Sequence, residues 1–269
     1  QARQKPTTDL DAWELYQRGM WHMYRYTAPD NVQAQRCFER AIELDPRSSS
    51  AYSGLAYANL LAVNMDYAPD EEKARADALE AAKTAVALDN KDAMAHLALG
   101  RAYGVRGVSD YDTAIVELSQ AIELNPSSAL AHFALGHTLT HIGRPDEALP
   151  EFEQAMRLSP HDPNLWLFQM ILGFALILLK QHEQALDWLQ KSVRHDNVGF
   201  WAYANLVSCL GHIGRKKEGQ EAARQLLKMK PDFSISLQPH LRNPAHLEHF
   251  YNGFLLAGLE ISRASPGAG

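Results

Sequence analysis

Histidine is the residue type in this sequence that most invites a chemical role, with twelve copies among 269 residues. His137 and His141 are four positions apart, so on a helix they share one face and could hold a metal ion together. No cysteine or carboxylate completes such a site in the same helix. His141 and His212 also stand in the same sequence, His-Ile-Gly-Arg, at the end of an expected helix, where a protonated imidazole suits the helix dipole. We therefore interpret these histidines as structural and expect no bound metal and no cofactor.

Other residues that could perform catalysis lack the spacing that catalysis needs. The chain has no G-x-S-x-G elbow and no glycine pattern that would hold a phosphate. Cys37 and Cys209 lie in apolar helical stretches without metal-ligand spacing, which favours a role as small core residues. We expect that the chain is not an enzyme. A catalytic or metal-binding protein that uses its histidines remains the alternative.

Composition excludes several classes of partner. The net charge is −6, so the chain lacks the basic surface that nucleic-acid binding requires, and anionic lipid would repel it. The longest apolar run, 165–179, contains Gln169 and Gly173 and is shorter than the roughly 20 residues of a membrane span. We interpret it as a buried helix. The chain starts with glutamine, so we expect a fragment of a longer protein, cytoplasmic, or periplasmic if a transmembrane helix precedes residue 1.

A sequence pattern that repeats along the chain predicts the helices on which the histidines and cysteines lie. Small and large apolar residues recur at fixed spacing before a Pro or Asn in six segments: Ala34, Phe38, Ala41, Pro46; Ala78, Ala82, Ala85, Asn90; Ala114, Leu118, Ala121, Pro126; Ala148, Phe152, Ala155, Pro160; Ala185, Leu189, Ser192, Asn197; and Gly219, Ala223, Leu226, Pro231. The closing residues are spaced 44, 36, 34, 37 and 34 positions apart. A 34-residue period with this pattern resembles the tetratricopeptide repeat. It implies an all-α, right-handed superhelical solenoid in which each unit is a helix A, a turn and a helix B.

The flanking residues support this division. Glycines recur in helix A at positions 19, 100, 136 and 173, where a small residue lets helix A approach helix B. Ser48, Asp92, Ser128 and Asp162 are suitable N-caps for the next helix A, and Pro163 suits its first turn. Gly143 and Gly214 suit the left-handed position that ends a helix.

The expected domain boundaries follow from the repeats. Residues 1–9 form an N-terminal tail, and the six units span about 10–46, 49–90, 93–126, 129–160, 163–197 and 200–231. Residues 232–260 form a capping segment with a helix near 244–257, and 261–269 form a flexible tail. Extra residues lie near 61–70 and 27–30, and the fifth unit is expected to have a lengthened first helix.

Three stretches suggest a narrower relationship: LDAWELYQRGMWHMYRYT (10–27), FWAYANLVSCLGHIGR (200–215) and PDFSISLQPHLRNPAHLEHFYNGFLLAGL (231–259). Together with the order of the repeats, they resemble the C-terminal repeat region of bacterial class III adenylate/guanylate cyclases. A similar region follows the winged-helix domain of some bacterial transcription regulators. The resemblance covers nearly the whole chain but includes neither effector domain, so it implies a regulatory module in a signalling protein and no catalytic residue.

The resemblance also implies where a partner binds, because helix A of each repeat lines the inner groove of this family. The corresponding positions are mostly aromatic or apolar: Trp13, Tyr16, Met20, Tyr57, Leu97, Arg101, Phe133, His137, Met170, Phe174, Ile177, Trp201 and Ser208. Such a groove suits a peptide from another protein, or a second copy of this chain in a homodimer. The alternatives are that the chain itself fills part of the groove, or that the protein is a purely structural scaffold.

Overall fold

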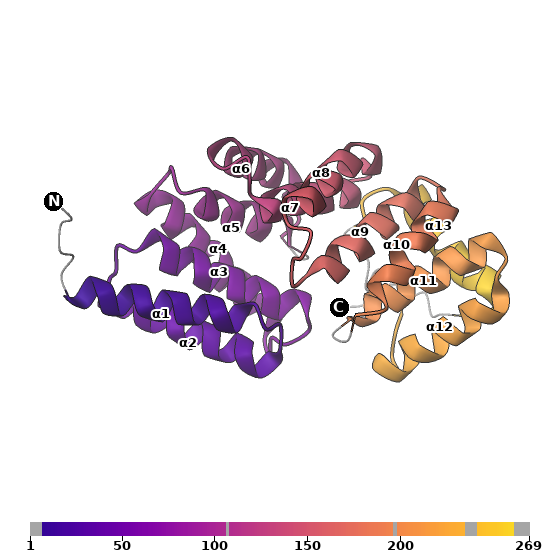
Figure 1. Cartoon of the computed structure of the whole chain (residues 1–269), viewed down its shortest axis with the longest axis horizontal. Coiled ribbons are helices and arrows are strands. Elements are labelled where there is room, and N and C mark those ends of the chain that lie inside the picture. The colour runs from indigo at the N-terminus through magenta and orange to yellow at the C-terminus, as the bar shows by residue number, and fades with distance from the viewer. Residues whose placement is uncertain (1–6, 106–107, 196–197, 235–240, 261–269) are drawn as a thin grey trace. The chain divides into compact units, whose positions relative to one another are not determined.

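The fold is all-α. A computed structural model describes residues 7–105, 108–195, 198–234 and 241–260, which form thirteen helices and no strand (Figure 1). The helices are α1 (Thr7–Met23), α2 (Ala28–Leu44), α3 (Ser49–Asn64), α4 (Glu71–Leu88), α5 (Ala93–Gly104), α6 (Tyr111–Leu124), α7 (Ala129–His141), α8 (Pro145–Leu158), α9 (Leu165–Leu178), α10 (His182–Ser192), α11 (Phe200–Ile213), α12 (Lys216–Met229) and α13 (Pro244–Ala257). The first twelve form six successive pairs, as expected of six two-helix repeats.

The chain divides into two compact units, residues 1–134 and 135–269, which we describe separately. The boundary falls within α7. None of the described helices is both long enough and apolar enough to cross a membrane. Asn197, residues 1–6 of the expected N-terminal tail and the expected tail at 261–269 lie outside the described residues.

Close contact between the two helices of a repeat depends on the glycines of helix A. A methyl group on Gly19 would lie 2.6 Å from Cε1 of Phe38, and one on Gly136 would lie 2.8 Å from the same atom of Phe152. Both phenylalanines are fully buried. Real Cβ atoms do not approach other atoms this closely, so a larger residue would push helix A away from helix B. The expected function of the recurring glycines is therefore confirmed.

The helix ends follow the expected chemistry except at two residues before α9. The side chain of Ser48 accepts a hydrogen bond from the backbone of Ala51, and Gly143 and Gly214 have φ angles of +89° and +80°. The exceptions are Asp162 and Pro163, because α9 begins at Leu165 and its N-cap is Asn164. The N-cap expected at Asp162 is therefore wrong, and Pro163 lies before the N-cap instead of in the first turn. Oδ1 of Asp162 accepts a hydrogen bond of 2.8 Å from the backbone of Asn164 in a turn.

The extra residues lie partly where the sequence places them. In the second repeat, α3 continues to Asn64 and a connection leads to α4 at Glu71. The expected lengthened first helix of the fifth repeat is wrong, because α9 has 14 residues, the same as α11. Lys180 adopts a left-handed conformation, with φ of 61°, and turns the chain into α10. The additional residues of this repeat lie between α10 and α11.

Helix α13 packs on the last repeat, as expected, but not as a further helix of the stack. The stacked helices α3, α5 and α11 each contact the helix B of the preceding repeat at least as much as its helix A. In contrast, α13 packs mainly on α11, less on α12, and also reaches α9 (Figure 1). It therefore lies across the A helices of the fifth and sixth repeats, a surface that we call the helix A surface of the second unit.

The crossing of α13 over α11 is unusually close. A methyl group on Gly211 would lie 1.8 Å from the backbone oxygen of Gly253, and one on Gly253 would lie 2.3 Å from Oγ of Ser208. Ser208 donates a hydrogen bond of 2.8 Å to the backbone oxygen of Phe250. Phe250 and Phe254 are fully buried. The close crossing lets these two phenylalanines reach the core of the second unit.

The close crossing predicts the effect of adding one methyl group to α13. Alanine is the better helix former by about 1 kcal/mol, so Gly253→Ala would stabilise an isolated α13. In the folded chain the methyl group collides with Ser208, and we expect a net loss of about 1–3 kcal/mol in the free energy of unfolding. Urea denaturation measures this loss, and hydrogen exchange of the α13 amides locates it. Leu256→Ala is the control, because Leu256 is 55% exposed on the same helix. A Gly253→Ala protein as stable as the parent would show that the crossing is looser than described.

Candidate functional site

The thirteen expected groove residues separate into two groups by burial. Six are at least partly exposed: Trp13, Tyr16, Met20, Arg101, His137 and Trp201. Seven are buried, with side chains at most 5% exposed: Tyr57, Leu97, Phe133, Met170, Phe174, Ile177 and Ser208. These seven side chains do not line an open groove in this structure, and the groove remains a prediction at the other six positions.

In the second unit, the cause of this burial is α13. The ring of Phe174 makes an edge-to-face contact with that of Phe250, with centroids 5.1 Å apart. Ser208 is hydrogen-bonded to the backbone of α13. Trp201 lies beside Phe233 at a centroid distance of 5.5 Å and remains half-buried. The chain itself thus fills the helix A surface of this unit.

In the first unit, side chains of α1, α3 and α5 form a partly open surface. Tyr16 and Met20 of α1 pack against the core around Tyr57 and remain half-exposed. The guanidinium of Arg101 lies 4.7 Å from the centre of the Tyr57 ring, and its Nη1 donates a hydrogen bond of 3.4 Å to the phenol oxygen. Burial, and then the negative charge of Asp92, raises the pKa of Tyr16. We call Tyr16, Met20, Tyr57 and Arg101 the α1–α5 surface.

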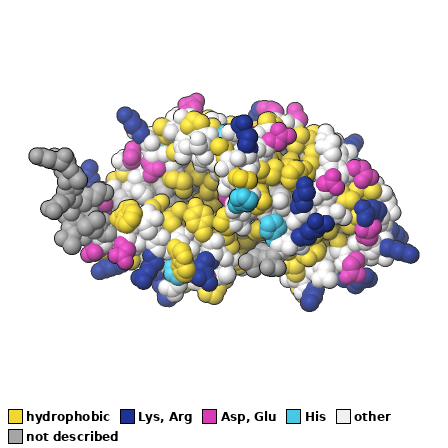
Figure 2. All heavy atoms as spheres, in the orientation of Figure 1, with side chains coloured by type: hydrophobic (Ala, Val, Ile, Leu, Met, Phe, Trp, Pro, Cys, Tyr) yellow, Lys and Arg dark blue, Asp and Glu magenta, His cyan; other side chains and the backbone are white. Residues whose placement is uncertain are grey.

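Further aromatic residues of α1 are exposed next to this surface. Trp13 and Trp21 are each 57% exposed, and Tyr24 just beyond the helix is 46% exposed. Arg25 lies over the Trp21 ring at 4.8 Å. Hydrophobic side chains are visible between charged ones over α1 in Figure 2. The expected groove positions include Trp13 but neither Trp21 nor Tyr24, although the aromatic character of these two residues close to Trp13 is visible in the sequence.

Of the paired histidines of α7, His141 is buried and does not have the expected charge. His141 is 3% exposed, and its Nδ1 donates a hydrogen bond of 2.9 Å to the backbone oxygen of His137. Burial lowers the pKa of His141 to about 4, more than the hydrogen bond from its ring to His137 raises it. His141 is therefore neutral at pH 7 and does not act as a cation at the helix end. The expected dipole interaction is wrong for this residue.

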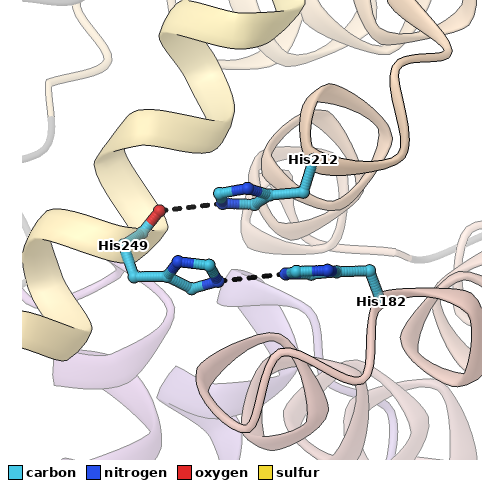
Figure 3. A group of neighbouring side chains, drawn as sticks. All are labelled: His182, His212 and His249. Carbon is cyan, nitrogen blue, oxygen red and sulfur yellow. Dashed lines mark hydrogen bonds between the residues drawn. The ribbon is translucent and has the colours of Figure 1, made fainter.

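Three other histidines, which sequence reasoning did not connect, lie together in the second unit. His182 is the first residue of α10, His212 lies near the end of α11, and His249 lies in α13 (Figure 3). One ring nitrogen from each lies within 4.8 Å of the other two. Nε2 of His182 is 3.0 Å from Nε2 of His249, and Nε2 of His212 donates a hydrogen bond of 2.9 Å to the backbone oxygen of His249. We call these three residues the histidine cluster.

The histidine cluster is held in a partly buried, electropositive place. Burial, followed by the positive charge of His212, lowers the pKa of both His182 and His249, that of His249 to about 4. Lys180 adds further positive charge and lines a cavity of about 410 Å³ beside His249. The thiol of Cys209 donates a hydrogen bond of 3.2 Å to the backbone oxygen of His182, and burial raises its pKa to about 12. Neutral imidazoles grouped in this way can bind a metal ion or accept a proton.

Comparisons with protein families identify repeats in three regions of the chain. Residues 109–143 match the model of a TPR repeat, and residues 143–199 and 26–76 match two models of the tetratricopeptide repeat. Superkiller complex protein 3 of Mus musculus is 24% identical over 257 residues, covering 76% of this chain and 16% of its own length. Small glutamine-rich tetratricopeptide repeat-containing protein 2 of Mycosarcoma maydis is 32% identical over 87 residues, covering 32% of this chain and 24% of its own length. The chain thus spans less than a quarter of either relative.

Solved structures show the same fold at low sequence identity. Pseudomonas aeruginosa pilF is 17% identical, with a TM-score of 0.59, over 91% of this chain and 99% of that one. TTC0263, a TPR protein of Thermus thermophilus, is 21% identical, with a TM-score of 0.57, over 74% of this chain and 98% of that one. A chain of the APC/C hetero-tetramer Cut9–Hcn1 is 16% identical, with a TM-score of 0.64, over 90% of this chain and 46% of that one.

The buried state of His141 predicts acid sensitivity of the second unit. Its pKa is about 4 in the folded chain and 6.5 when exposed, so the unfolded state binds more protons between these values. The stability contributed by neutral His141 is present above pH 6.5 and is lost as the pH falls toward 4. The loss is roughly 3 kcal/mol if complete. The free energy of unfolding should therefore decrease less on acidification in His141→Leu than in the parent.

Urea denaturation at several pH values between 7 and 4 measures this difference. His161→Leu is the control, because His161 is an exposed histidine of the same unit. Equal acid sensitivity of His141→Leu and the parent would contradict a buried neutral His141.

Proposed function

Because this chain is a tetratricopeptide repeat protein, a class that mediates protein–protein interactions, we propose that it is an interaction module that binds a helical segment of a partner protein. The segment binds to the α1–α5 surface of the first unit. Trp13 and Trp21 extend the contact along α1. The proposal assigns no catalytic step to the chain.

The position of α13 is the observation that carries this proposal. The helix A surface of the second unit holds an amphipathic helix, which buries Phe250 and Phe254 and leaves Leu255 and Leu256 exposed. The A helices of this type of repeat can therefore form a surface that accepts a helix, as they do in the second unit. Helix-in-groove binding uses anchors at this helical spacing. In the first unit, we infer that the corresponding helix comes from another molecule.

The side chains of the α1–α5 surface suit such a ligand. Tyr16 and Met20 offer half-exposed aromatic and flexible apolar contact area, as hot spots of protein interfaces do. Arg101 is held over Tyr57, so less of its rotamer freedom is lost when it binds a carboxylate or the carbonyl end of a helix. Leu97 and Phe133 are buried and are not part of the proposed contact surface. Phe174, Ile177 and Ser208 contact the chain's own α13 in the second unit, and Met170 is buried there.

The resemblance to the repeat regions of bacterial cyclases and winged-helix regulators suggests what such a module would regulate. A regulatory module would transmit partner binding to an effector domain, such as a nucleotidyl cyclase or a winged-helix domain. The ligand could equally be a second copy of the chain, in which case the same surface forms a homodimer. Exposed Trp13 and Trp21 suit both ligands.

The proposal predicts that a helical ligand loses affinity when the α1–α5 surface is truncated. Helical peptides selected for binding to the chain from a display library are the probe. We expect Arg101→Ala and Tyr16→Ala each to weaken the selected peptides by about 1–4 kcal/mol, the range of interface hot spots. Fluorescence anisotropy measures the affinity. Urea denaturation of each variant separates a loss of affinity from a loss of stability, because Tyr16 also packs against Phe38 and Arg101 lies over Tyr57.

Val116→Ala is the matched control, because Val116 is 65% exposed on the B helix α6 and lies outside the proposed surface. Sedimentation velocity of the parent and the variants tests the homodimer. A concentration-dependent dimer that Arg101→Ala abolishes would identify a second copy as the ligand. Peptides that bind Arg101→Ala and Tyr16→Ala as tightly as the parent would contradict the proposed surface.

A further inference from the structure

We propose that His182, His212 and His249 bind one divalent transition metal ion, with Zn²⁺ as the reference ion, and that this ion fastens α13 to the last two repeats. The three ligands come from α10, α11 and α13, so the site exists only while α13 is docked. The proposal is independent of what the α1–α5 surface binds.

The spacing of the imidazoles is close to that of metal ligands. Two nitrogens bound tetrahedrally at 2.0–2.1 Å from one zinc ion are separated by roughly 3.3 Å. Nε2 of His182 and Nε2 of His249 are 3.0 Å apart and point toward one another (Figure 3). The ligand nitrogen of His212 lies within 4.8 Å of both. Small shifts of the first two rings would bring their Nε2 atoms to this separation. The His212 ring is stacked on both of them, at centroid distances of 4.5 and 4.1 Å, so it would have to turn its ring and give up its hydrogen bond to the backbone of His249 in order to bind the ion.

The backbone around the cluster supplies the outer contacts that metal-binding histidines usually have. The ring of His249 is also hydrogen-bonded to the backbone of Ile177. Because Nε2 of His249 faces His182, the hydrogen bond to Ile177 belongs to Nδ1, which leaves the Nε2 lone pair directed at the cluster. A second ring nitrogen bound to a backbone carbonyl is the usual device that fixes the tautomer of a metal ligand. The thiol of Cys209 bonds to the backbone oxygen of His182 and thereby holds the start of α10, without contacting the His182 ring.

The ligand chemistry selects the class of ion. Imidazole suits Zn²⁺, Cu²⁺ and Ni²⁺, whereas Ca²⁺ and Mg²⁺ prefer oxygen ligands. The lowered pKa of His182 and His249 keeps both rings neutral at pH 7, the form that binds a metal. A neutral imidazole that carries its proton on the ligand nitrogen must change tautomer to bind, so the Nε2 proton of His182 moves to Nδ1 of the same ring through water. Each ligand stays a neutral imidazole, and no redox change is involved. Three histidines leave one position of a tetrahedral zinc ion to water. Lys180 is the neighbouring cation that opposes binding.

Metal binding would stabilise the docked position of α13. The ion binds the docked state and not the undocked state, so it shifts the equilibrium toward docking in proportion to its concentration and affinity. Hydrogen exchange of α13 should then be slower with Zn²⁺ than with EDTA. The amides of the first unit provide an internal reference, because no ligand comes from that unit.

The test starts with the purified full chain, stripped with EDTA and dialysed at pH 7. We expect isothermal titration with Zn²⁺ to give one ion per chain, and Co²⁺ to give the visible absorption of a tetrahedral site. Long-range ¹H–¹⁵N spectra of the imidazoles should show Zn²⁺ shifting the signals of three histidines. His249→Gln and His182→Gln should each weaken Zn²⁺ binding at least about tenfold.

His161→Gln is the matched control, an exposed histidine of the same unit that should leave the affinity unchanged. The imidazole spectra of the parent keep the proposal testable if a cluster variant fails to fold. The proposal is overturned if the parent binds no Zn²⁺ at equimolar concentration, or if Zn²⁺ shifts histidines outside the cluster. Unchanged Zn²⁺ affinity in folded His249→Gln would also overturn it.

Discussion

The helices of this chain are held together by contacts at which one partner has no side chain. Gly19 and Gly136 let a large ring of helix B lie against the backbone of helix A, and Gly211 lets the backbone of α13 lie against that of α11. Because the interior is packed at the density of a crystal, these positions accept no additional methyl group without a shift. The distance between helices, the burial of Phe38 and Phe152, and the surface left on the opposite side of each A helix all depend on this constraint.

The two units use that surface differently. In the second unit, the crossing at Gly211 and Gly253 places α13 on the A helices and buries Phe174 against Phe250. In the first unit, Tyr16 and Arg101 remain half-exposed around Tyr57. A surface that holds an internal helix in one unit is the physical reason to propose an external helix on the other. The function proposed for the chain is therefore an extension of its own packing.

The histidines show how burial and partners decide the role of one residue type. His96 lies between the carboxylate of Glu117 and the backbone of Asn90, and His132 makes the equivalent bond to the backbone of Pro126. Both connect a helix A to the end of the preceding helix B. His141 is buried and neutral. The histidine cluster differs because its members face one another as well as the backbone, which is why the proposed metal site lies there.

The sequence by itself determined the class of fold, the six helix pairs and the capping helix. These features are local, since the glycines, alanines and caps act within about 40 residues along the chain. The tertiary structure decided which residues of the groove are open. Phe174 and Ser208 occupy the same repeat positions as exposed groove residues. They are buried because α13 packs on them, and α13 lies about 40 residues or more farther along the chain. Only the packing of three helices, likewise, brings His182, His212 and His249 together, because residues with no fixed spacing in the chain become neighbours through contacts that no local pattern encodes.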